Sequence, residues 1–129
     1  MSGRFLLDTN TIIDLFAGKN SVKENLMHAN EVFISSIAIG ELYFGAYKSH
    51  NTNNNLRQID DFTASCTVLC CNQDTAHEYG IIKNKLREKG MPIPENDIWI
   101  ASIARQYDLI LITSDNHFDK IEDLKHEKW

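Results

Sequence analysis

Residues Leu109–Asp115 read LILITSD, an apolar run that ends in a carboxylate, and residues Arg4–Asp8 repeat the pattern as RFLLD. Short apolar runs of this kind are typical of strands buried within a parallel sheet. The ligands of such sheets bind beyond the carboxyl ends of the strands. We therefore expect Asp8 and Asp115 to lie together at the ligand-binding edge of a parallel sheet.

Two further acids stand in apolar surroundings. Glu41 is the only charged residue between Val32 and Tyr47, and Asp97 opens the apolar run Ile98–Ala101. A buried carboxylate without a partner costs several kcal/mol or takes up a proton. A bound divalent cation would supply the missing compensation. The four acids therefore predict a metal site on an α/β core.

The rest of the chain alternates predicted strands with predicted helices. We expect strands at 4–8, 32–35, 67–71 and 109–113, and helices at 10–16, 21–28, 36–47, 55–64, 74–89 and 96–107. The expected N-caps include Asn10 or Thr11, Ser21, Asp74 and Asn96, while residues 118–129 are too mixed to assign. Strands separated by helices predict right-handed crossovers and a parallel sheet. A length of 129 residues fits one domain over 1–129.

Composition narrows the class of protein. No apolar run approaches the ~20 residues of a membrane span, and the N-terminus does not resemble a signal peptide, so we expect a cytoplasmic protein. The net charge of −5 argues mildly against general nucleic-acid binding, because phosphate contacts need Lys and Arg. Cys66, Cys70 and Cys71 match no zinc pattern and are interpreted as small apolar side chains.

Carboxylate oxygens are the ligands that Mg²⁺ and Mn²⁺ prefer. Two such ions about 3.5–4 Å apart can activate a water and stabilise the leaving oxygen of a phosphodiester. Of the five histidines only His117 lies beside the acidic runs, and its default interpretation is an exposed loop residue. If a metal-activated water attacks the phosphodiester, the cleaved strand should carry 5′-phosphate and 3′-hydroxyl ends.

Each acid also has a purely structural interpretation. Asp8 suits a turn or an N-cap, Asp97 suits the first turn of a helix, and Asp115 lies in good turn sequence. Glu41 has the weakest structural interpretation, because no basic residue lies within one helical turn of it. Taken together, the order and apolar settings of the acids favour a functional site.

The ordered set of motifs resembles a known family. The set comprises Leu7-Asp8-Thr9-Asn10, Ile39-Gly40-Glu41-Leu42 with Gly45, Asn96-Asp97-Ile98-Trp99-Ile100-Ala101, and Ile112-Thr113-Ser114-Asp115 with Phe118. It resembles the PIN domain, in particular the VapC toxins of bacterial toxin–antitoxin pairs. The resemblance spans nearly the whole chain, down to Trp129, and implies a three-layer α/β/α fold with a central, mainly parallel sheet. It also implies Mg²⁺- or Mn²⁺-dependent endoribonuclease activity.

The resemblance assigns roles and partners. Asp8, Glu41, Asp97 and Asp115 would be the catalytic and metal-binding acids, and the matches to Asp8 and Asp97 are the ones most often assigned to metal. Thr113 would support the site, and Asn10 is a weaker supporting candidate. The implied partners are RNA, a small cognate antitoxin and a second copy of the chain. Glu95, a fifth acid near the site, departs from the pattern and is expected to alter metal affinity.

Three other functions compete with this interpretation. A DNA or structure-specific nuclease could use the same acids, but it would need a duplex-sized basic surface. A phosphoryl-transfer enzyme could use Asp8 as a nucleophile, but a haloacid-dehalogenase-like hydrolase would need a second Asp where this chain has Asn10. A receiver-like signalling module would need a Lys at the end of the strand that here ends in Thr113-Ser114-Asp115. A non-catalytic binding protein is disfavoured by the intact acids. The sequence leaves open which RNA is cut and whether one ion or two are bound.

Three further features of the sequence bear on the surface and the site. Lys83, Lys85, Arg87 and Lys89 are interpreted as a solvated helix face rather than an RNA-binding patch. Tyr43, Phe44 and Tyr47 are expected in the core or on a partner-binding surface. Repulsion among the acids is expected to raise at least one carboxylate pKa.

Overall fold

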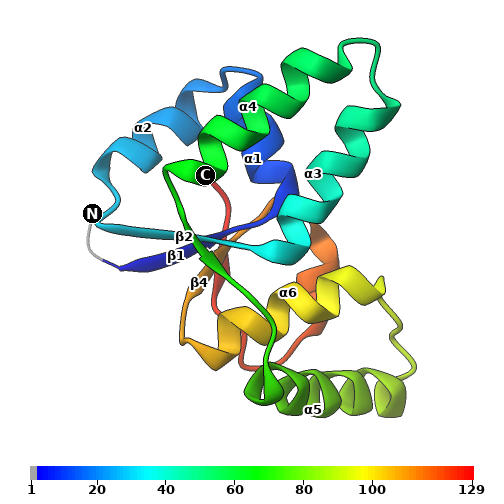
Figure 1. Cartoon of the computed structure of the whole chain (residues 1–129). Helices are drawn as coiled ribbons and strands as arrows, with labels where there is room; N and C mark the ends of the chain where they lie inside the picture. Colours follow the sequence, from blue (N-terminus) through cyan, green and yellow to red (C-terminus); the bar gives the residue numbers. More distant parts are fainter. Residues whose placement is uncertain (1–2) are drawn as a thin grey trace.

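A five-stranded sheet with helices on both faces forms the centre of the computed structural model, which describes residues 3–129 (Figure 1). The strands are β1 (Arg4–Leu7), β2 (Glu31–Ser35), β3 (Thr67–Leu69), β4 (Ile110–Ile112) and β5 (His126–Glu127). The helices are α1 (Thr9–Phe16), α2 (Asn20–His28), α3 (Ser36–Lys48), α4 (Thr52–Ala64), α5 (Gln73–Lys89) and α6 (Glu95–Gln106), with a 3₁₀ helix η1 (Asn116–Lys120). Within residues 3–129, no helix combines the length and apolar character needed to cross a membrane.

The strand order is β3-β2-β1-β4-β5, and every neighbouring pair is parallel. The chain runs outward from β1 to β3 and then crosses to β4 on the other side, so the order reverses between β1 and β4. Leu7 pairs with Ile112 across this boundary, which places Asp8 and Thr113 just beyond the carboxyl ends of the two strands. Ligands of open α/β sheets bind at such a reversal point.

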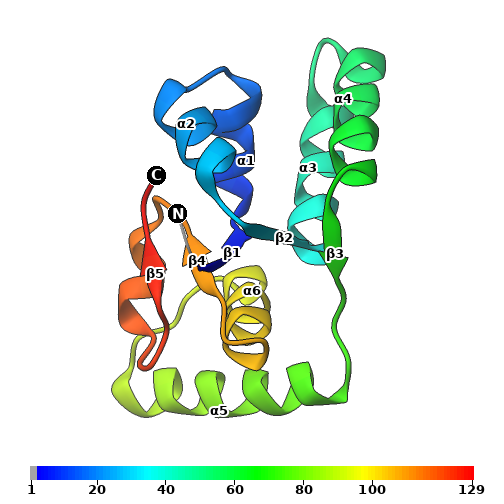
Figure 2. The same ribbon diagram turned by 90° about the vertical axis from the view of Figure 1, so that its left-hand side faces the viewer.

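Alternating side chains of β1 divide the core into two layers. Leu6 packs in the cluster formed with α5 and α6, whereas Phe5 and Leu7 pack in the cluster formed with α1 to α4. This alternation follows from the two-residue period of a strand. Figures 1 and 2 show α5 and α6 on one side of the sheet and α1, α2 and α4 on the other. The predicted three-layer α/β/α fold with a parallel sheet is therefore confirmed.

Several predicted helix starts were wrong by a few residues. The N-cap of α1 is Asp8 rather than Asn10 or Thr11, because its carboxylate accepts the N–H of Thr9. The N-cap of α6 is Pro94 rather than Asn96, because the Pro94 carbonyl accepts the N–H groups of Asp97 and Ile98. Asp97 consequently lies in the first helical turn.

The starts of α2, α4 and α5 also differ from prediction. Lys19 rather than Ser21 precedes α2, and α4 begins three residues before the expected Asn55. Asn72 rather than Asp74 caps α5, because its side chain accepts the N–H of Thr75 while the Thr75 hydroxyl accepts the N–H of Asn72. This reciprocal pair is a capping box.

The unassigned C-terminal segment completes the sheet. Leu111 N–H donates to the carbonyl of Lys125, and Thr113 N–H donates to the carbonyl of Glu127, which aligns β5 beside β4. Trp129 then packs edge-on against Phe5, with the ring centroids 5.2 Å apart. The C-terminus is thus tied to the first strand and to the strand that carries the site.

Candidate metal centre

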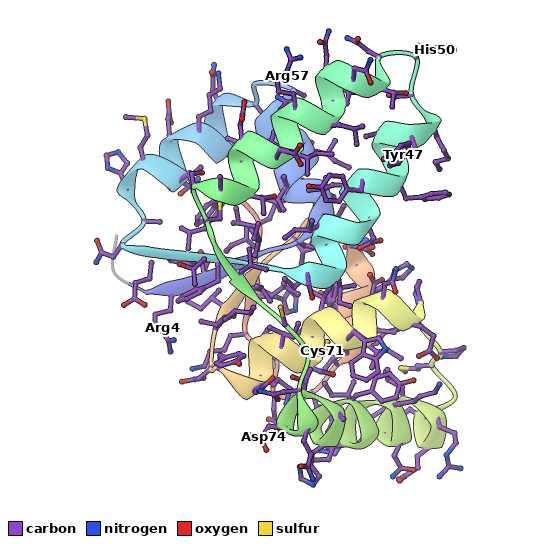
Figure 3. The ribbon with its side chains drawn as sticks, viewed as in Figure 1. Arg4, Tyr47, His50, Arg57, Cys71 and Asp74 are labelled. Atoms are coloured by element: carbon purple, nitrogen blue, oxygen red, sulfur yellow. The ribbon has the colours of Figure 1, made fainter. Side chains whose placement is uncertain are left out.

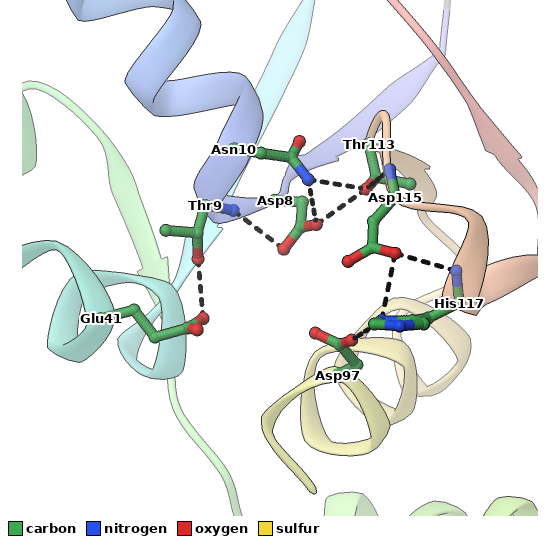
Figure 4. A network of polar contacts seen from close by, with 8 residues as sticks. All are labelled: Asp8, Thr9, Asn10, Glu41, Asp97, Thr113, Asp115 and His117. Atoms are coloured by element: carbon green, nitrogen blue, oxygen red, sulfur yellow. Dashed lines mark hydrogen bonds and ion pairs between the residues drawn. The ribbon is translucent and has the colours of Figure 1, made fainter. Parts of the chain in front are cut away.

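Asp8 is buried at the carboxyl end of β1, with 4% of its surface exposed. Its Oδ2 accepts hydrogen bonds from Thr113 Oγ1 at 2.7 Å and from Asn10 Nδ2 at 3.2 Å, and its Oδ1 accepts the Thr9 N–H at 2.8 Å (Figure 4). Three donors therefore fix the orientation of this carboxylate. None of them carries a positive charge.

Thr113 and Asn10 link the ends of β1 and β4 around Asp8. Besides donating to Asp8, the Thr113 hydroxyl accepts the N–H of Asp115 at 3.0 Å. The Asn10 side-chain oxygen accepts the N–H of Ser114 at 3.2 Å. These two side chains therefore set the position of Asp115 relative to Asp8.

Glu41 reaches the same edge of the sheet from α3. Ser35 ends β2 and caps α3 by accepting the Ala38 N–H at 3.0 Å, so the helix begins directly at the carboxyl end of that strand. The Thr9 hydroxyl then donates to Glu41 Oε1 at 2.8 Å. Figure 4 shows this carboxylate pointing toward the space between Asp8 and Asp97.

Asp97 and Asp115 meet at the ring of His117. His117 Nδ1 lies 2.9 Å from Asp97 Oδ2 and 3.1 Å from Asp115 Oδ1. Asp115 also caps η1, because its Oδ1 accepts the backbone N–H of His117 at 2.9 Å. The turn that follows β4 thus brings Asp115 toward the first turn of α6 (Figure 4).

Burial and mutual repulsion perturb two of the acids. Removal from water raises the pKa of Asp8 from 3.8 to about 6. Repulsion by Asp97 and Glu41 adds to this rise, and the hydrogen bonds from Thr113 and Thr9 oppose it. Burial likewise raises the pKa of Asp97, and Asp115 and Glu41 add to that rise while His117 opposes it. The predicted direction is confirmed, but loss of hydration rather than repulsion is the first cause in both cases.

The donor set fits a divalent cation. Within residues 3–129, no Lys or Arg side chain forms an ion pair with any of the four acids. Ligand atoms from Asp97, Asp115 and His117 all lie within 4.8 Å of one another. Repulsion links the acids pairwise, since Asp97 and Glu41 act on Asp8, and Asp115 and Glu41 act on Asp97. Hard oxygen donors without a cationic partner are the surroundings that Mg²⁺ and Mn²⁺ favour.

The structure brings together all four predicted acids and both supporting residues. Glu95, the fifth acid noted near the site, instead bonds to Lys83 Nζ at 2.6 Å and to Tyr79. His117 and Thr9 are the members that sequence reasoning did not select. Their only signal was position, two residues after Asp115 and immediately after Asp8.

Comparisons with known proteins find relatives along nearly the whole chain. The sequence profile of the PIN domain family matches residues 5–124. Ribonuclease VapC2 of Haemophilus influenzae is 36% identical, and the tRNA(fMet)-specific endonuclease VapC of Shigella flexneri is 34% identical, each over 98% of both chains. A chain from the crystal structure of DNA-bound VapBC of Salmonella typhimurium superposes with a TM-score of 0.91 and 32% identity over 98% of both chains.

Proposed function

Because the chain belongs to the PIN domain family, among its VapC ribonucleases, we propose that it is a metal-dependent endoribonuclease and the toxin of a toxin–antitoxin pair. The observation that carries the proposal is the convergence of four carboxylates, without a Lys or Arg ion pair in the described chain, where the sheet order reverses. A structural cluster would be expected to neutralise these acids with basic side chains.

Asp8, Asp97 and Asp115 would hold Mg²⁺ or Mn²⁺, with Glu41 as a direct or water-mediated ligand. The bound ion would offset phosphate charge and lower the pKa of water. The chain itself supplies orientation, since Thr113 and Asn10 hold Asp8 from one side. Thr9 holds Glu41 facing the same space.

The test is cleavage of RNA by the purified chain with EDTA, Mg²⁺ or Mn²⁺. Initiator tRNA is the first substrate to try, because the Shigella relative bears that name. Asp8→Asn and Asp97→Asn should each lower the rate by orders of magnitude, because ligation depends on charge. Asp61→Asn, an exposed change on α4, is the matched control and should cleave like the parent. Cleavage of duplex DNA but not of RNA would contradict the proposal.

An antitoxin partner is supported by the surface beside Glu41. An open groove there is lined by Ile13, Phe16 and Leu42, and Glu41 also lines it. Phe44 and Tyr47 on α3 are 64% and 69% exposed. Figure 3 shows where Tyr47 lies on this helix. The groove suits a partner segment with apolar side chains followed by a basic one, which would neutralise the acids and displace the cation.

Growth assays separate the toxin from a housekeeping nuclease. Expression of the chain alone should arrest growth, and co-expression of a small neighbouring gene should restore growth and yield a purified complex. Harmless expression of a nuclease-active chain would contradict the toxin assignment.

A homodimer and a cytoplasmic location form part of the same proposal. Light scattering of the purified chain tests the first, and fractionation of the cells tests the second.

A further inference from the structure

His117 is held firmly against two of the acids although its side chain is 43% exposed. Its backbone N–H is bonded to Asp115, and the next residue, Phe118, is completely buried in the core cluster beneath α6. The backbone that carries the ring is therefore held by the bond to Asp115 and by the buried Phe118. Nδ1 is the ring atom that faces Asp97 and Asp115.

The two distances from His117 Nδ1 match the spacing of neighbouring ligand atoms around one ion, and the atoms of all three residues lie within 4.8 Å of one another. In an octahedral site with bonds of about 2.1 Å, adjacent ligand atoms are about 3.0 Å apart. The Nδ1 separations here are 2.9 Å to Asp97 Oδ2 and 3.1 Å to Asp115 Oδ1. The same distances also suit hydrogen bonds from a protonated ring, so a direct measurement of nitrogen ligation is required.

We propose that His117 is a nitrogen ligand of the cation held by Asp97 and Asp115, so that this site takes Mn²⁺ in preference to Mg²⁺. The inference deepens the proposed nuclease function by naming the ion. Mg²⁺ takes hard oxygen ligands, whereas first-row transition ions accept imidazole readily. Two carboxylates with one imidazole form a mixed set that favours a first-row transition ion over Mg²⁺, and Mn²⁺ is the ion of that row that also accepts carboxylate oxygens well.

The experiment measures Mn²⁺ binding to the metal-free chain by electron paramagnetic resonance, without RNA. The loss of the free-ion signal gives the Kd, and pulsed double resonance reports whether a ¹⁴N nucleus is coupled to bound Mn²⁺. His117→Asn offers an oxygen in place of the nitrogen. His77→Asn, on the exposed surface of α5, is the matched histidine control.

The parent and His77→Asn should show ¹⁴N coupling, and His117→Asn should lose it. The Mn²⁺ Kd of His117→Asn should rise at least about tenfold, by analogy with the loss of groups that orient metal ligands. The Kd for Mg²⁺, measured by competition, should change less, so the preference for Mn²⁺ shrinks.

Absence of ¹⁴N coupling in the parent overturns the proposal, and this result does not depend on whether the variant folds. Coupling that persists in His117→Asn overturns it as well. So does tighter binding of both ions by that variant, which would identify His117 as a competing counter-charge. Cleavage of RNA is scored separately: cleavage without nitrogen coupling contradicts only the ligand assignment, and coupling without cleavage contradicts only the nuclease function.

Discussion

Replacing Asp8 with asparagine should stabilise the metal-free protein at neutral pH. Burial raises the pKa of Asp8 from 3.8 to about 6, which means that the fold disfavours the ionised carboxylate. Each unit of pKa corresponds to about 1.36 kcal/mol, so ionised Asp8 destabilises the fold by about 3 kcal/mol. Asparagine is uncharged at every pH and nearly the same size.

Lost hydrogen bonds reduce the stabilisation that Asp8→Asn is expected to give. In the Asp8→Asn protein the remaining side-chain oxygen can still accept the Thr9 N–H, but the new amide nitrogen would face Thr113, whose hydroxyl must then accept instead of donate. Asn10 would also lose its bond to Oδ2. A lost bond of this kind costs about 1 kcal/mol, so the expected net stabilisation is about 2 kcal/mol at pH 8.

The pH dependence identifies the cause. Because the folded pKa is raised, the contribution of Asp8 is most favourable below pH 3.8 and is lost as pH rises through about 6. The stability difference between Asp8→Asn and the parent should therefore grow from about pH 4 to about pH 6 and then level off.

Urea unfolding in EDTA, at closely spaced pH values from about 4.5 to 8, measures this difference. Asp61→Asn should show a flat difference near zero, because Asp61 is exposed on α4. Saturating Mg²⁺ should stabilise the parent and narrow its gap to Asp8→Asn. An Asp8→Asn protein that is less stable than the parent at pH 8, or a difference independent of pH, would refute this reasoning.

Further changes probe the remaining contacts. At a hundredfold excess over Kd, Mn²⁺ should stabilise the parent by about 2.7 kcal/mol in thermal melts and Asp97→Asn by much less. Thr113→Val should lower cleavage and cost about 1–2 kcal/mol in urea unfolding, because it removes one of the three donors to Asp8 and the acceptor of the Asp115 N–H, whereas Thr113→Ser should retain both bonds. Trp129→Ala should cost about 3 kcal/mol in the same assay, through lost packing on β1. Glu95→Gln should leave the Mn²⁺ Kd unchanged in titrations, because Glu95 engages Lys83 rather than the site.

The sequence pattern predicts the layers and the parallel sheet because each buried strand is marked locally by an apolar run. The apolar runs before Asp8 and Asp115 mark buried parallel strands, and the reversal of strand order then brings these two acids to one edge. Glu41 and Asp97 could be placed near that edge because each occurs early in a helix that follows a strand or a loop.

The strand β5, which pairs with β4 at the edge of the sheet, has no apolar run that would predict it. β5 consists of His126–Glu127, and it has no apolar alternation of its own. Its pairing depends on backbone bonds to Leu111 and Thr113 and on the packing of Trp129 against Phe5. Such contacts exist only once the rest of the sheet has formed, so a local pattern cannot reveal them.

The role of His117 was hidden for a similar reason. A single histidine after a turn is most often an exposed loop residue. Its contact with Asp97 joins positions 20 residues apart, and it depends on where α6 begins. The same holds for Thr9, whose hydroxyl meets Glu41 only because α3 begins directly after β2.

The most direct test of the central claim is hydrolysis of RNA in ¹⁸O-water by the purified chain supplied with Mn²⁺. We expect fragments with 5′-phosphates that contain one ¹⁸O atom and 3′-hydroxyl ends, with no product in EDTA and a rate lower by orders of magnitude for Asp8→Asn. Cleavage in EDTA, or products with 2′,3′-cyclic phosphates, would contradict a cation-assisted attack by water at the four acids.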